Sequence, residues 1–156
     1  MERRITFVGL DVHKETISVA LADGGSRDAA RFYGQIENNP TALSKIAAKL
    51  ALRHGALHFC YEAGPCGYGV YRQLQALGHA CLVAAPSLIP RRCGDRVKTD
   101  RRDAISLAQL HRRGELSAVW VPEPAHEACG DLVRTRAIAV QAVRRARSVC
   151  KDFAAA

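Results

Sequence analysis

Apolar residues near the start of the chain gather in short runs that end at charged or turn-forming residues. The run ITFVGL covers residues 5–10 and ends at Asp11, and the run TISVALA covers residues 16–22 and ends in the turn signal DGG. A third run extends from residue 29 to residue 37. Runs of this length and composition are typical of β-strands. Because the links between them are short, the pattern predicts an antiparallel meander of three strands.

The spacing of apolar residues then changes to a helical period. Leu43, Ile46, Ala47 and Leu50 recur at helical intervals after a start signal at 39–41, which predicts a helix that ends at 54–55. Apolar runs at 57–63 and 80–85 predict two further strands, with a helix over 68–77 between them. The order β-β-β-α-β-α-β predicts an α/β fold, a mixed sheet with helices packed on its faces.

The second half of the chain is predicted to be mainly helical. Residues 86–99 contain prolines, a glycine and many charges and are expected to be irregular. Thr99 is placed to cap a helix that runs to Arg113 and ends at Gly114. An extended connector, SAVWVPEP, leads into one long basic helix over about 125–153. We therefore expect a sheet domain over 1–120 and a helical segment over 121–156.

Composition narrows the class of protein. Apolar residues make up 48% of the 156, which is enough for a packed core. No apolar run approaches the roughly 18 residues of a membrane span. The first apolar run is broken by charged residues that exclude a secretory signal, so we expect a cytoplasmic protein. Cys60 and Cys81 lie inside apolar runs and are predicted to be reduced core residues, and no cysteine pair has the spacing of a zinc site.

The positive charge of the chain is concentrated in its second half. The formal net charge is +8, and residues 91–113 hold eight Lys or Arg against three acids. Residues 134–151 hold six more and no acid. Such clustering favours a polyanionic partner, and the alternative is a solvated helix surface. The basic residues predicted to contact nucleic-acid phosphates are Arg91, Arg92, Arg96, Lys98, Arg101 and Arg102.

Four acids occupy positions that suit a metal site. Asp11 and Glu62 lie at the ends of two predicted strands, and Asp100 and Asp103 lie one helical turn apart at a helix start. Carboxylates that converge in this way can hold Mg²⁺ or Mn²⁺ for phosphodiester chemistry. The alternative is that the strand-end acids are incidental and the helical pair only caps its helix. His13 follows the first acid and either contacts DNA or a metal-bound water, or is simply a polar turn residue.

Four segments of the chain carry a resemblance to a known family. They are GLDVHKETISVALAD, YEAGPCGYGVYRQLQALGH, VAAPSLIPRRCGDRVKTDRRDA and GELSAVWVPEPAHEACGDLVR. In collinear order they resemble the DEDD transposases of insertion sequences, the family of Piv-type invertases and of recombinases guided by a bridge RNA. The resemblance implies an RNase H-like, RuvC-like domain whose four metal-binding acids fall on Asp11, Glu62, Asp100 and Asp103.

The resemblance also implies a function and its partners. The chain is expected to be the N-terminal catalytic domain of a DNA transposase or site-specific recombinase, with DNA and a structured guide RNA as ligands. Relatives carry a second domain with a catalytic serine after a coiled-coil segment, so we expect this chain to be incomplete alone. Self-association or pairing with a full-length copy is a further expectation. The alternatives are a stand-alone nuclease of the Holliday-junction type and a non-catalytic nucleic-acid-binding remnant.

Overall fold

The computed structural model describes residues 5–90 and 99–154. The chain divides into two compact units, Met1–Trp120 and Val121–Ala156. The first unit contains the strands β1 (Ile5–Val12), β2 (Thr16–Asp23), β3 (Arg31–Glu37), β4 (Ala56–Glu62) and β5 (Ala80–Ala84). Its helices are α1 (Pro40–His54), α2 (Gly69–Ala76), the short 3₁₀ helix η1 (Pro86–Leu88) and α3 (Asp100–Arg113). The second unit is the helix α4 (Pro124–Ala154).

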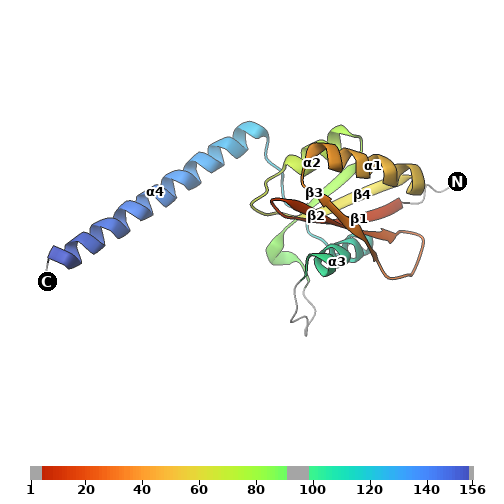
Figure 1. Ribbon diagram of the computed structural model, residues 1–156, viewed down its shortest axis with the longest axis horizontal. Helices are drawn as coiled ribbons and strands as arrows, with labels where there is room; N and C mark the ends of the chain where they lie inside the picture. Colours follow the sequence, from red (N-terminus) through yellow and green to blue (C-terminus); the bar gives the residue numbers. More distant parts are fainter. Residues whose placement is uncertain (1–4, 91–98, 155–156) are drawn as a thin grey trace. The chain divides into compact units, whose positions relative to one another are not determined.

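The five strands form one mixed sheet in the order β3-β2-β1-β4-β5. Neighbouring strands are antiparallel from β3 to β1, whereas β4 is parallel to β1 and β5 is parallel to β4. Helices α1 and α2 cover one face of the sheet and α3 covers the other (Figure 1). This strand order and these directions are those of an RNase H-like sheet, so the predicted fold class is confirmed.

The burial of the three meander strands follows their positions in the sheet: the inner strand β2 is apolar and the edge strand β3 is partly polar. All residues of β2 from Ile17 to Ala22 are buried, which requires cover on both faces. The edge strand β3 is only partly buried and has polar residues at alternate positions. Cys60 is buried and Cys81 is partly buried, and both are free thiols, in agreement with the sequence prediction.

The two long helices of the first unit begin at side-chain caps. Asn39 accepts a hydrogen bond from the Ala42 amide at 2.8 Å at the start of α1. Thr99 accepts one from the Arg102 amide at 3.3 Å at the start of α3, and left-handed Gly114 ends that helix. These caps satisfy amide groups that lack partners inside a helix and fix the residue at which each helix begins.

Helix α3 lies unusually close to the sheet because both surfaces carry small residues. Ala104 and Ala108 of α3 pack against Ala20 and Ala22 of β2. A Cβ atom added to Gly9 of β1 would overlap the Ala104 carbonyl oxygen and lie 2.5 Å from the Ala108 amide nitrogen. The helix backbone therefore rests directly on β1, and only glycine fits at residue 9.

The far end of α3 is held by an aromatic cluster and by an arginine. The Phe7 ring meets His58 and His111 edge-on, at centroid distances of 5.7 and 5.1 Å. Burial, and to a smaller extent the charge of the nearby His58, lowers the pKa of His111 to about 4, so His111 packs as a neutral ring. Arg112 donates to three carbonyl oxygens of the turn after β2, those of Asp23, Ser26 and Asp28.

The second unit is a single helix with little burial. Its large apolar residues, among them Leu132, Ile138 and Val149, are exposed. Within the described part of the chain, no helix is both long enough and apolar enough to cross a membrane.

We predict that Gly9→Ala lowers the free energy of unfolding by about 1–3 kcal/mol, because overpacking forces α3 away from β1. Gly69→Ala is the matched control, since a Cβ atom there meets nothing within 4 Å. Urea denaturation of the two variants and the parent chain measures the difference. An equally stable Gly9→Ala chain would show that α3 does not press on β1.

Candidate metal centre

The parallel register of β1 and β4 places two of the predicted acids on one face of the sheet. Leu10 pairs with Tyr61, so Asp11 and Glu62 are the next residues along their strands. Side chains alternate between faces, and Gly9 and Cys60, two residues earlier, both face α3. The Cys60 thiol donates to the Leu107 carbonyl oxygen of α3 at 3.5 Å. Asp11 and Glu62 therefore share the α3 face.

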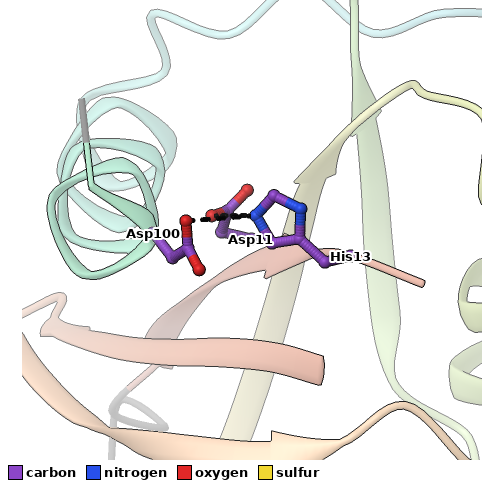
Figure 2. A group of neighbouring side chains, drawn as sticks. All are labelled: Asp11, His13 and Asp100. Carbon is purple, nitrogen blue, oxygen red and sulfur yellow. Dashed lines mark hydrogen bonds and ion pairs between the residues drawn. The ribbon is translucent and has the colours of Figure 1, made fainter. Parts of the chain in front are cut away.

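The first turn of α3 brings a third acid to the end of β1. Figure 2 shows Asp11, His13 and Asp100 turned toward one another, with one nitrogen of the imidazole facing both carboxylates. The His13 Nε2 atom lies 3.1 Å from Asp11 Oδ2 and 3.3 Å from Asp100 Oδ1. One donor atom from each residue lies within 4.8 Å of the other two, which is close enough for all three to share one cation.

Asp11 is the enclosed member of this group. Its side chain is 15% exposed, whereas those of His13 and Asp100 are each 52% exposed. Burial is the largest effect on Asp11 and raises its pKa. The charge and the hydrogen bond of His13 lower this pKa in part, and the charges of Asp103 and Asp100 raise it. Like charges held together in this way are unfavourable unless a cation lies among them. The arrangement therefore favours cation binding.

The donor set fits a hard divalent ion. Two carboxylates and an imidazole, with solvent access on the Asp100 side, match the ligands that Mn²⁺ accepts, and the carboxylates alone match Mg²⁺. Asp103 lies near enough for its charge to act on Asp11. A carboxylate near the group, such as that of Asp103, can add a ligand to an ion that also keeps water ligands.

The structure brings some of the predicted site residues together and leaves others apart. Asp11 and Asp100 share the group described above, whereas Glu62 and Asp103 lie outside it. His13, which the sequence left open, belongs to the group, and its only sequence signal was the spacing of two residues after Asp11. Arg101 and Arg102 are exposed on the first turn of α3. The remaining basic residues, Arg91, Arg92, Arg96 and Lys98, lie outside the described residues.

The known proteins that this chain resembles in sequence are transposases. The model of a transposase family, that of the IS110-type DEDD transposases, matches residues 8–152. The chain is 49% identical over 150 residues to the protein y4qE of Sinorhizobium fredii, named as a candidate transposase, covering 96% of this chain and 38% of that one. It is 42% identical over 137 residues to the transposase for insertion sequence element IS1533 of Leptospira borgpetersenii, covering 87% and 39%.

The chain thus spans about two fifths of the length of these curated relatives. Among solved structures, it aligns with T. thermophilus RuvC in complex with a Holliday junction substrate at a TM-score of 0.47 and 11% identity, covering 74% of this chain and 99% of that one. It aligns with the large terminase nuclease of thermophilic phage G20c at a TM-score of 0.40 and 16% identity, covering 74% and 58%. The family assignment rests on the sequence matches.

We predict that Mn²⁺ raises the melting temperature of the chain and that Asp11→Asn and Asp100→Asn each weaken this effect, because each removes a charged ligand. Glu115→Gln, at an exposed acid beyond the other end of α3, is the charge-matched control. Thermal denaturation across a Mn²⁺ titration measures the shift. A shift that survives both substitutions would place the bound ion elsewhere.

Proposed function

This chain belongs to the IS110-type DEDD transposase family, and we propose that it is the N-terminal catalytic domain of a DNA transposase or site-specific recombinase. In this proposal the domain binds DNA and uses carboxylate-held Mg²⁺ or Mn²⁺ for phosphodiester chemistry. The observation that supports it most strongly is the meeting of Asp11, His13 and Asp100 at the end of β1.

The proposed ligands of the ion are Asp11, Glu62, Asp100 and Asp103. Asp11 and Asp100 already lie within reach of a common ion, and Glu62 shares their face of the sheet. When bound, the ion would supply positive charge to stabilise the negative charge that develops on a phosphodiester during cleavage. The buried position of Asp11 strengthens this electrostatic effect, because partial exclusion of water lowers the local dielectric constant.

The chain's own residues are proposed to hold and orient the DNA. Arg101 and Arg102 follow Asp100 directly and would place positive charge beside the ion for neighbouring phosphates. The first turn of α3 adds the favourable field of a helix N-terminus for an anion. The His13 Nε2 atom lies within hydrogen-bond distance of both carboxylates and can orient them. Arg91, Arg92, Arg96 and Lys98, which lie outside the described residues, are proposed to contact phosphates as well.

Three further features of the proposal come from the family resemblance. A structured guide RNA would be a second ligand of the same basic surface. Other copies of the chain, or full-length transposase, would be protein partners. The place of action would be the cytoplasm, where the DNA of a bacterial insertion sequence lies.

We predict that the chain nicks branched DNA in the presence of Mg²⁺ or Mn²⁺. Asp11→Asn or Asp100→Asn should reduce the cleavage rate on the order of 100-fold. Loss of a residue that only hydrogen-bonds to a metal ligand already costs about 10–100-fold, and these two acids are proposed as ligands themselves. Glu115→Gln should retain the parent rate. Gel analysis of end-labelled junction DNA measures the cleavage. Binding without cleavage by the parent chain under either metal would instead support a non-catalytic binding module.

We predict that the affinity for duplex DNA falls steeply with salt concentration and that Arg101→Ala with Arg102→Ala lowers the slope of log K against log salt by about two, since each lost phosphate contact changes it by about 0.9. Fluorescence anisotropy at several salt concentrations measures the slope. The comparison variant is Arg144→Ala with Arg145→Ala, at exposed positions on α4. If only this second pair lowers the slope, the DNA-binding surface lies on α4.

A further inference from the structure

An open hollow lies beside the candidate metal centre. It has a volume of about 440 Å³ and is lined by Ser18, Phe32, Gln35, Thr99, Asp100 and Arg101. Asp100 belongs both to this hollow and to the group that can share a cation, so the two sites are continuous. A ligand bound in the hollow would therefore extend from the metal centre over β2 and β3.

The floor of the hollow continues a row of polar side chains that begins at Asp11. Ser18 of β2 is the cross-strand partner of Asp11 in β1, and Gln35 of β3 is the partner of Ser18. Directly opposed residues of antiparallel strands point to the same face, so an acid, a hydroxyl and an amide lie in line under the start of α3. The Gln35 amide nitrogen donates to Thr16 Oγ1 at 3.1 Å, which fixes its orientation. The row ends at β3, the open edge of the sheet.

The wall of the hollow carries a cation–π pair, Arg101 over Phe32. The Arg101 guanidinium carbon lies 5.2 Å from the centre of the Phe32 ring. Phe32 is partly buried, whereas Arg101 is exposed. A guanidinium group held over an aromatic ring is a planar, positively charged surface, on which a nucleobase stacks favourably while a phosphate pairs with its charge. The pair thus offers both of the interactions that a nucleotide needs.

The size of the hollow fits one nucleotide. A volume of about 440 Å³ is within the range of small-molecule sites. A base within a duplex has both of its faces covered by its neighbours, and it must leave the stack to lie against a side chain. An unpaired nucleotide has no such cost, so it is the form of DNA that the cation–π pair recognises best.

We propose that this hollow binds one unpaired DNA nucleotide adjacent to the phosphodiester at the metal centre, with its base stacked on the Arg101–Phe32 pair. The inference rests on the proposed DNA function and specifies the form of its substrate. It assigns the exposed amide of Gln35 to the edge of the base or to the sugar. The strand would leave the site across β3.

Binding of the full chain to labelled DNA, without divalent metal, tests the proposal apart from cleavage. The probes are a duplex with one unpaired thymidine, the same duplex fully paired, and the same duplex with an abasic unit in place of the unpaired thymidine. The parent chain should bind the unpaired thymidine more tightly than either other probe, on the order of tenfold, as expected for one stacked base. Arg101→Lys keeps the charge but loses the planar surface, so the ratio of its affinities for the unpaired-thymidine and fully paired probes should fall to about one.

Two further variants make the result specific. Phe32→Leu should abolish the preference as well, and its thermal denaturation shows whether the fold is intact; if it does not fold, Arg101→Lys alone decides the outcome. Arg113→Lys, at the other end of α3, should retain the preference. A parent chain that binds all three DNA probes equally would overturn the inference while leaving the proposed DNA function intact, whereas a chain that binds no DNA would contradict both.

The same test separates DNA from RNA. A matched RNA duplex with one unpaired uridine is the comparison probe. Tighter binding of the RNA, lost in Arg101→Lys, would assign the hollow to RNA and overturn the proposal for DNA. A preference for unpaired thymidine that persists in both Arg101→Lys and folded Phe32→Leu would place the recognition of the unpaired base at another site.

Discussion

The contact between α3 and β1 at Gly9 is the constraint on which the candidate site depends. A side chain at residue 9 would overlap the backbone of α3 at Ala104 and Ala108. The small residues of β2 extend the same contact, so the whole helix rests near the sheet surface. Because α3 begins only four residues before Ala104, its position over β1 also determines where Asp100 lies. The distance between Asp100 and Asp11 is thus a consequence of packing further along the helix.

This packing assembles charges that repel one another. Burial and two neighbouring carboxylates raise the pKa of Asp11, and the imidazole of His13 offsets part of that effect. Ionised carboxylates held close together repel one another unless a cation lies among them. The cluster is easier to explain as a binding site whose favourable state includes a cation. The same reasoning applies to the adjacent hollow, where Arg101 supplies positive charge and Phe32 supports it.

Much of the fold was predictable from local sequence. The apolar runs located all five strands, and the caps at Asn39 and Thr99 located the starts of α1 and α3, with differences of one or two residues at element ends. Asp11 and Asp100 were singled out because each lies at the end or start of an element. The importance of Gly9 was not predictable, because a glycine inside an apolar strand shows no sign of the distant helix that it contacts. His13 offered only its spacing from Asp11, and its distance to Asp100 depends on the tertiary position of α3.

The most direct test of this account is the affinity for Mn²⁺ of a chain in which α3 is displaced while every candidate ligand is retained. Gly9→Ala and the milder Ala108→Val change only the contact between α3 and the sheet, and Gly69→Ala is the control. Electron paramagnetic resonance of free Mn²⁺, under conditions in which circular dichroism shows each variant folded, gives the dissociation constants. The account predicts that Gly9→Ala and Ala108→Val bind Mn²⁺ more weakly than the parent chain and that Gly69→Ala binds it as the parent does. Folded Gly9→Ala and Ala108→Val chains that bind Mn²⁺ as tightly as the parent would contradict it.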